Sequence, residues 1–400
     1  MSFASHQLAH TVPTVSTTEY FNQKVGAQTV LVKKPILTVD NNAEIRDIDP
    51  VGTASFGSSV DFLISDKGFN LTGLGVRMNL GALTSSWTGG TYDRMAPLLN
   101  GIISRVEIFG NDGAVLLQTI DGPALAVVDE LYYNDQDSAI YAVAGVPSSA
   151  GAIDLMTKLP TFIDAMGSLP LYALQGQIRI RFTLRALRDA IVHDRTTTTG
   201  TPTCAITNFQ LRLELQNPPL ALKQKTINVH AGNIPVAYRY AFPVVSNIDI
   251  VNGSTTTQKQ LTSVVGPITH MVFYIQPQAV PVQNQLLVAN AVAITSFELK
   301  SSTGEQLTGK QPISDRTDRL YLMPDWFKGD GYRTQSLYAF SWGEEPESGL
   351  EKGHNSGVHM FSGSETLTLN YSTIGQASLA SVIQYQLRWI EIHLGQIKVM

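Results

Sequence analysis

Strict alternation of apolar and polar residues, repeated in segments along the whole chain, is the feature that most limits the possible folds. A period of two places the apolar set on one face of a β-strand, because successive side chains point to opposite sides of a sheet. The clearest segments are "GQIRIRFTL", "FQLRLEL" and "ETLTLNY". The residues predicted to face inward in them are Ile178, Ile180, Phe182, Leu184, Phe209, Leu211, Leu213, Leu215, Leu367, Leu369 and Tyr371.

Turn-forming residues separate these segments, and few stretches keep helical spacing for more than two turns. The best short helix is predicted in "DGPALAVVDELYY", residues 121–133, which starts at an Asp cap with Pro123 in its first turn. The chain is therefore predicted to be all-β with short helical decorations.

An internal repeat accounts for the length of the chain. "RVEIFGNDGAVL" and "SFELKSSTGEQL" share an apolar-Glu-apolar strand followed by a turn with glycine. Glu107 and Gly113 of the first segment correspond to Glu298 and Gly304 of the second, and both pairs are 191 positions apart. This spacing indicates two similar β units in tandem, each near 190 residues.

A second correspondence lies near the end of each unit. Gln210 in "NFQLRLEL" matches Gln386 in "YQLRWIEI", now at an offset of 176. The first unit should therefore carry about fifteen more loop residues before its last strand. Residues 185–203 have the composition expected of that extra loop.

Bulk composition supports two cores and argues against nucleic acid as a direct partner. Four hundred residues exceed what one hydrophobic core usually spans, and 43% of them are hydrophobic. The net charge is −5 and no run of Lys or Arg occurs, so no sequence-specific nucleic acid binding is expected. We expect an N-terminal arm at 1–22, a first β unit at 23–220 and a second at 221–400.

The single cysteine and the N-terminal residues limit how the chain can be stabilised and whether it is expected to be secreted. Cys204 alone can form neither an internal disulfide nor a cysteine zinc site, so stability must come from packing or assembly. The first twenty residues lack a basic start followed by an apolar core. We expect a soluble, unsecreted chain with a flexible or partner-ordered N-terminal arm.

One motif resembles a phosphate-binding loop. In "SSTGEQLTGKQP", Gly304, Gly309 and Lys310 have the P-loop spacing, but Gln311 stands where a magnesium-binding hydroxyl is required. The matching turn of the first unit, "FGNDGAVLL", has no lysine. A strand-turn-strand is therefore the better interpretation.

Other candidate sites also have simpler interpretations. His354 and His359 are five residues apart with no third ligand, and Glu344, Glu345 and Glu347 form a clustered acidic loop. His193 and Asp194 have no nucleophile elbow to complete a triad. The scattered aromatics Trp326, Phe327, Trp342 and Trp389 suit a core or an interface. The sequence predicts no catalytic residue, no cofactor-binding residue, no metal site, and hence no enzyme and no cofactor.

Six segments, taken in order, resemble the double jelly-roll major capsid proteins of large eukaryotic DNA viruses, virophages and tailless icosahedral phages. For the first jelly roll they are "VDFLISDKGFNLTGLGVRMNL" (60–80), "LLNGIISRVEIFGNDGAVLLQTIDG" (98–122) and "LPLYALQGQIRIRFTL" (169–184). For the second they are "ITHMVFYIQP" (268–277), "ITSFELKSSTGEQL" (294–307) and "GVHMFSGSETLTLNYS" (357–372). The resemblance covers most of residues 55–400.

This resemblance implies two tandem eight-stranded jelly-roll β-barrels and a structural role in the virion. Homotrimers would form pseudo-hexagonal capsomers in an icosahedral shell assembled in the host cell. Loops near 134–160 and 185–205 would face outward and the N-terminal arm inward. The implied partners are other copies of the chain, neighbouring capsomers, minor capsid and penton proteins, and an internal membrane under the shell.

Two other functions stay open at this point. A tandem β-sandwich that binds or processes carbohydrate would share this composition and turn density. A nucleotide hydrolase using Lys310 is the third hypothesis. The mass of the native species separates the capsid hypothesis from both of these alternatives, because a capsomer protein is predicted to be a homotrimer.

Overall fold

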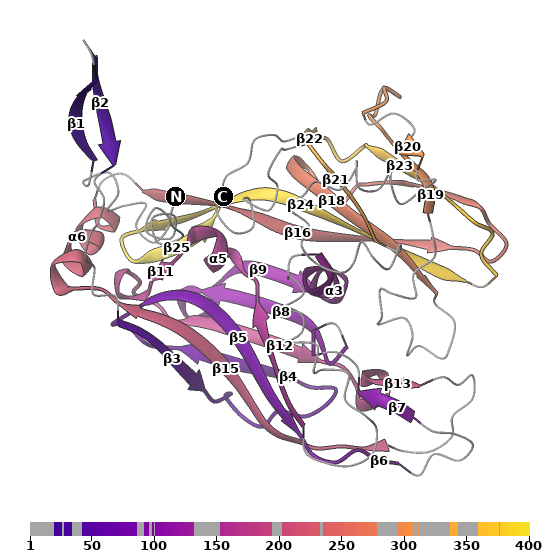
Figure 1. The fold of residues 1–400 in the computed structure, drawn as a ribbon, viewed down its shortest axis with the longest axis horizontal. Coiled ribbons are helices and arrows are strands. Elements are labelled where there is room, and N and C mark those ends of the chain that lie inside the picture. The colour runs from indigo at the N-terminus through magenta and orange to yellow at the C-terminus, as the bar shows by residue number, and fades with distance from the viewer. Residues whose placement is uncertain are drawn as a thin grey trace.

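The computed structural model describes residues 20–25, 28–33, 42–85, 92–95, 98–99, 101–131, 153–193, 202–232, 235–277, 294–307, 311–312, 337–342, 359–375 and 377–400 (Figure 1). Most of these residues lie in antiparallel sheets. We call the strands from β3 to β15 the first unit and those from β16 to β25 the second unit.

The first unit pairs its strands in two sheets. One sheet has the order β10-β5-β15-β3 with β11 beside β5, and the other has the order β4-β12-β8-β9. The strands are β3 Asn42–Ile48, β4 Ser59–Ile64, β5 Asn70–Leu80, β8 Ile103–Gly110, β9 Val115–Asp121, β10 Ile153–Leu159, β11 Leu169–Pro170, β12 Ile178–Leu184 and β15 Ile206–Asn217.

The second unit repeats this arrangement. One sheet has the order β16-β24-β18-β21, with β22 beside β18 and β25 beside β24, and the other has the order β17-β23-β19-β20. The strands are β16 Val236–Ile250, β17 Thr256–Gln260, β18 Gly266–Pro277, β19 Ile294–Lys300, β20 Gln311–Pro312, β21 Leu337–Ser341, β22 His359–Phe361, β23 Thr366–Tyr371, β24 Ser378–His393 and β25 Gln396–Val399.

The two strand orders coincide when eight principal strands of each unit are matched in chain order. Strands β8 and β19, which hold Glu107 and Glu298, take the same place, and so do β15 and β24, which hold Gln210 and Gln386. The connection from β12 to β15 has 21 residues and the matching one from β23 to β24 has 6, a difference of 15. The repeat and its extra loop, both predicted from the sequence, are confirmed.

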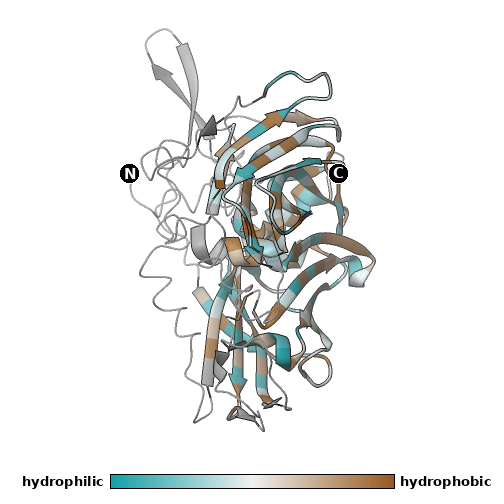
Figure 2. Ribbon diagram, turned by 90° about the vertical axis from the view of Figure 1, so that its right-hand side faces the viewer, coloured by the Kyte–Doolittle hydropathy of each residue, from teal (hydrophilic) through white to brown (hydrophobic). Residues whose placement is uncertain are grey.

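The inward faces are also those predicted from the period of two. All eleven residues expected to face inward are buried. Figure 2 shows hydrophobic and hydrophilic residues alternating along the strands. The alternation exists where a strand has one face on a core and the other outside it. Strand β18 is buried on both faces instead, because Met271 and Phe273 lie in the second core and Val272 and Tyr274 lie in the cluster that includes the first-unit core.

Short elements complete the fold. The helix expected within 121–133 is α3, Gly122–Leu131. The others are α5 Phe162–Met166, α6 Leu220–His230, and the 3-10 turns η1 Asn111–Gly113, η3 Leu171–Ala173 and η4 Leu187–Ala190. The small strand pairs are β1 Tyr20–Val25 with β2 Gln28–Lys33, β6 Thr84–Ser85 with β14 Pro202–Thr203, and β7 Tyr92–Met95 with β13 Ile191–His193. The N-terminal arm was expected to end at residue 22, but strand β1 extends across that position. Helix α6 connects β15 of the first unit to β16 of the second.

Candidate functional site at the junction of the two units

The two units share a hydrophobic core at their junction. Tyr238, Tyr240, Ile390, Ile392 and Ile397 come from strands β16, β24 and β25 of the second unit, yet they pack in one cluster with the first-unit core. Other second-unit residues form a core of their own. In Figure 1 helices α3 and α5 lie between the first-unit sheets and β16 and β24, and β9 is the first-unit strand nearest to β16. Apolar burial therefore holds the two units together.

A side-chain amide joins the units at the end of β8. Asn111 Nδ2 donates to the Ile397 carbonyl at 2.8 Å, and Ile397 N donates to Asn111 Oδ1 at 3.0 Å. The amide thus pairs with β25 as another strand would. A Cβ atom at Gly110 would collide with Ile397 Cγ2, so glycine permits this close approach.

The turn that carries Asn111 is backbone-strained. Asn111 and Asp112 have φ values of 51° and 58°, in the left-handed region. Asp112 Oδ1 accepts from Gln177 N at 2.7 Å, and Asp112 N donates to Gln177 O at 3.1 Å. These bonds fix the turn against the loop that precedes β12.

The second unit supplies a strained turn of its own, between β24 and β25. Leu394 has φ of 50° and is followed by Gly395 at 76°. Gly395 O accepts from Gln175 N of the first unit at 2.9 Å, and Leu394 N donates to His230 O at 2.9 Å. Asn111, Asp112 and Leu394 are the non-glycine residues with positive φ in the described part of the chain, and all three lie at the junction. Such strain persists where surrounding contacts fix the backbone.

A lysine fixes the first-unit loop that receives this turn. Lys67 Nζ donates to the carbonyl oxygens of Leu174 at 3.1 Å and Gln175 at 3.0 Å, and also to that of Gly176. Partial burial of the ammonium group lowers the pKa of Lys67, and the carboxylate of Asp112 opposes that shift. The cation replaces the water that would otherwise solvate three adjacent carbonyls.

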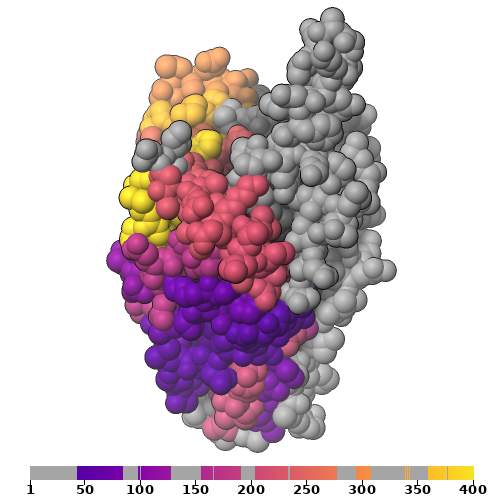
Figure 3. Space-filling model, turned by 90° about the vertical axis from the view of Figure 1, so that its left-hand side faces the viewer, coloured from indigo at the N-terminus to yellow at the C-terminus, as the bar shows by residue number. Residues whose placement is uncertain are grey.

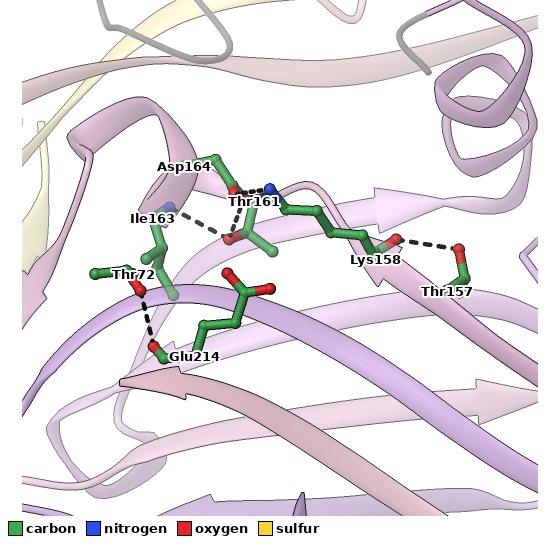
Figure 4. A network of polar contacts seen from close by, with 7 residues as sticks. All are labelled: Thr72, Thr157, Lys158, Thr161, Ile163, Asp164 and Glu214. Carbon is green, nitrogen blue, oxygen red and sulfur yellow. Dashed lines mark hydrogen bonds and ion pairs between the residues drawn. The ribbon is translucent and has the colours of Figure 1, made fainter. Parts of the chain in front are cut away.

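Helix α5 fixes the other side of the junction (Figure 4). Thr161 caps the helix by accepting from Ile163 N at 3.3 Å, while Asp164 Oδ2 accepts from Thr161 N at 2.8 Å. Burial raises the pKa of Asp164, and the Lys158 ammonium group, 3.4 Å from its carboxylate, opposes the shift. The cap holds Phe162 edge-on against Tyr240, with ring centroids 5.9 Å apart.

The buried tyrosine completes the contact. Tyr240 Oη donates to the Leu117 carbonyl of β9 at 2.8 Å. Burial raises the pKa of Tyr240 well above its usual range, so the hydroxyl stays protonated and remains a donor. The junction therefore combines apolar packing with hydrogen bonds that fix its register, and its chemistry suits a rigid contact between two units.

The structure places the motif at 301–312 in an antiparallel sheet. Strand β19 ends at Lys300, a turn with Gly304 at φ of 82° follows, and β20 pairs back onto β19. Gly113 at the matching turn has φ of 92°. A P-loop requires a parallel sheet and a following helix, so this segment is the predicted strand-turn-strand. Gly309 and Lys310 lie outside the described residues.

The remaining candidates from the sequence that fall on described residues lie in or beside separate elements. His359 lies in β22 with its ring stacked on Trp342, at 5.5 Å between centroids. His193 ends β13, and Cys204 is a half-buried free thiol. His354, Asp194, Glu344, Glu345, Glu347, Trp326 and Phe327 lie outside the described residues. Across the ranges that the structure describes, no group of three or more His, Cys, Asp or Glu residues could hold a metal ion.

The junction residues themselves were not predicted. The quoted "FGNDG" marks a turn, and Asn and Asp tolerate left-handed backbone better than most residues. That pattern could have indicated the conformation of the turn, but not its partner in β25.

Among the described helices, none is long and apolar enough to cross a lipid bilayer.

Comparisons with known proteins agree with this architecture. No family model and no curated protein matches the sequence. The Faustovirus major capsid protein matches with a TM-score of 0.69 and 10% identity, covering 92% of this chain and 92% of that chain. PBCV-1 VP54, fitted into a reconstruction of the virophage Sputnik, matches with a TM-score of 0.67 and 14% identity, covering 92% of this chain and 98% of that chain.

A third similar structure is another viral major capsid protein. The STIV major capsid protein matches with a TM-score of 0.50 and 13% identity, covering 86% of this chain and 97% of that chain. All three matches extend over nearly the whole of the known chains, so the likeness includes both units and their tandem order. The chain has the all-β, double jelly-roll fold that these viral major capsid proteins share.

Proposed function

We propose that this chain is the structural major capsid protein of an icosahedral virus and that it self-assembles as homotrimeric, pseudo-hexagonal capsomers in the virion shell. The observation that carries the proposal is the double jelly-roll fold, matched over 92% of this chain and 98% of a PBCV-1 capsid protein. Its activity would be association with other copies of itself.

The junction gives this proposal a physical basis. Two similar units held rigidly side by side provide similar lateral faces, and three chains then provide six units around a threefold axis. Six similar units fill a hexagonal position, whereas a dimer would supply four. A rigid junction is needed because a mobile one would allow the ring to close in many geometries.

The proposal also assigns roles to the parts of the chain. Residues 1–22 form an inward arm, 23–220 the first jelly roll and 221–400 the second, with the division at the start of α6. The segments near 134–160 and 185–205 face outward, with one correction to the first: residues 153–159, expected in that loop, form strand β10 beside β5. The chain acts without a cofactor and is not an enzyme. Neighbouring capsomers, minor capsid and penton proteins and an internal membrane are its proposed surroundings.

The carbohydrate-binding alternative is less well supported. A tandem β-sandwich of that kind would need a groove with exposed aromatics. The described Trp342 packs against the second core, and the exposed Trp389 has the Arg239 guanidinium over its ring, 5.4 Å from the centroid. The similar solved structures are capsid proteins. A broad glycan array with reproducible hits would revive this alternative.

The experiment that tests the proposal is a mass measurement of the native, purified chain, followed by electron microscopy of concentrated material. We expect a stable species of three times the 43.5 kDa chain mass, and hexagonal capsomers or particles in the images. A folded 43.5 kDa species that persists at high concentration would contradict the trimer, and images without capsomers or particles would contradict the capsid role.

A further inference from the structure

The covalent link between the two units contains the only asparagine–proline bond in the sequence, Asn217–Pro218. Asn217 is the last residue of β15, where it pairs with Asn42 of β3, and Pro218 and Pro219 lead into α6. Asn217 and Pro219 are exposed while Pro218 is buried. Figure 3, in which this end of the molecule faces the viewer, shows the segment around α6 at the surface, above the indigo strands of the first unit. A cut at this bond would divide the chain into its two units.

The proline leaves the asparagine side chain with one route of cyclisation. In most sequences the backbone nitrogen after an asparagine can attack the side-chain amide, which leads to deamidation and keeps the chain intact. The nitrogen of Pro218 carries no hydrogen, so this route is closed at Asn217. The route that remains is attack by the side-chain nitrogen on the backbone carbonyl carbon of the same residue, which breaks the chain.

A lysine contacts the amide that would attack. Lys223 Nζ donates to Asn217 Oδ1 at 2.7 Å. An ammonium group can only donate, so the amide oxygen faces Lys223 and Nδ2 is the free end of the amide. Asn217 Nδ2 makes no hydrogen bond within the part of the chain that the structure describes. A cation at Oδ1 stabilises the negative charge that this oxygen gains when Nδ2 loses a proton.

Helix α6 fixes the position of this lysine. Lys223 N donates to the Pro219 carbonyl at 3.1 Å, which forms the first turn directly after the two prolines. The far end of the helix is anchored at the junction, because the His230 carbonyl accepts from Leu394 N at 2.9 Å. Lys223 therefore reaches Asn217 from a helix that is held at both ends.

We infer that the chain cuts itself between Asn217 and Pro218, once per molecule and without a protease. Asn217 Nδ2 gives a proton to water and bonds to the backbone carbonyl carbon of its own residue. The bond from that carbon to the Pro218 nitrogen breaks, and the nitrogen keeps the electron pair and takes up a proton from water. One water molecule then opens the resulting C-terminal succinimide to asparagine or isoasparagine. The net reaction is hydrolysis of one peptide bond.

The burial of Pro218 makes the cut one-way. The new proline amine is largely protonated at neutral pH, and a charged amine is not stable in the buried position that the ring occupies in the intact chain. The cut end therefore moves away from Asn217. The two fragments stay together in the native protein, because Tyr240, Ile390 and Ile397 of the second unit pack in the core that they share with the first unit.

The experiment follows the purified full-length chain during long incubation at neutral and mildly alkaline pH. We expect two fragments on denaturing gels, one ending at residue 217 and one beginning at Pro218, as identified by intact mass spectrometry. The rate should rise with pH, because Nδ2 must lose a proton. Hydroxylamine should capture the succinimide at Asn217 as a hydroxamate. On a native sizing column the two fragments should elute together.

Four variants assign the roles, and circular dichroism confirms that each is folded. Asn217→Gln is the matched control, because it keeps the amide but requires a six-membered ring that closes far more slowly, so it should stay intact. Pro218→Ala restores a backbone N–H and should replace much of the cutting by deamidation of Asn217 in an intact chain. Lys223→Met should slow the cut by about tenfold, the contribution of one charge-assisted hydrogen bond. Lys223→Arg should keep most of the rate.

Three outcomes would overturn the inference. One is a wild-type chain that stays intact, and another is an Asn217→Gln variant that is cut as fast as the wild type, which would indicate a contaminating protease. The third is an equal rate in Lys223→Met and wild type, because the lysine would then contribute nothing. Each of these outcomes is independent of the proposed trimer, which is read from the mass of the native species.

Discussion

Asn111 and Ile397 lie 286 residues apart in the chain, yet they exchange two hydrogen bonds of 2.8 and 3.0 Å across the junction. The pair joins the turn after β8 to β25 and so sets the register of one unit on the other. Because the amide supplies both a donor and an acceptor, few other side chains could make the same contact.

Asn111→Ala should therefore destabilise the folded chain by about 1–3 kcal/mol, because it leaves the Ile397 N–H and carbonyl without their partners. Chemical denaturation checks the loss. Asn111→Gly separates hydrogen bonding from backbone strain, since glycine accepts φ of 51° without penalty. Asn111→Gly should therefore lose less stability than Asn111→Ala, and an Asn111→Ala variant as stable as wild type would show that the two bonds contribute nothing.

Close approach at Gly110 gives a second prediction. Gly110→Ala places a methyl group against Ile397 Cγ2 and should cost about 1–3 kcal/mol, the usual range for overpacking. The clash is relieved if the partner is shortened, so Gly110→Ala combined with Ile397→Ala should be more stable than the sum of the two single changes allows. Strictly additive losses in a double-mutant cycle would contradict the contact.

The strands were predictable from the sequence, because their signal is local. Ile180, Leu211 and Leu369 each stand in a run of strict alternation, and burial on one face of a sheet is what alternation encodes. The tandem order was predictable too, since Glu107 and Glu298 occupy matched strands and mark the repeat. The double jelly-roll fold followed from these strands and from family resemblance.

The junction was not predictable, because its contacts join residues that carry no mutual signal in one sequence. Lys67 bonds three carbonyls more than a hundred residues away. Leu394 adopts a left-handed backbone that leucine disfavours, so its residue type gives the wrong indication. Tertiary packing overrides local preference at this position.

The left-handed backbone at Leu394 predicts that a substitution there can stabilise the folded chain. Leu394→Asn should raise the free energy of unfolding by about 0.5–1 kcal/mol, because asparagine tolerates positive φ and Asn-Gly suits a two-residue hairpin turn. Little apolar burial is lost, since Leu394 is mostly exposed. Thermal unfolding checks the change. Leu394→Val is the control, and its branched side chain should lower the melting temperature. A melting temperature that falls in Leu394→Asn would mean that the leucine side chain has a contact worth more than the strain.

Buried His270 gives the last prediction, a loss of stability in acid. Its side chain has no exposed surface and its ring stacks on Tyr385 at 4.1 Å between centroids, with Nδ1 2.8 Å from Thr269 Oγ1. Burial lowers the pKa of His270 from 6.5 to about 3. The unfolded chain therefore binds a proton at this residue between pH 6.5 and 3 while the folded chain does not. Stability from this group is full above pH 6.5 and falls by up to about 1.4 kcal/mol per pH unit below it.

His270→Phe keeps an aromatic ring on Tyr385 and removes the titration, so its free energy of unfolding should depend less steeply on pH between 6.5 and 3. Burial also lowers the pKa of His230, which leaves part of the slope in the variant. Identical slopes in wild type and His270→Phe would show that His270 is protonated in the folded chain.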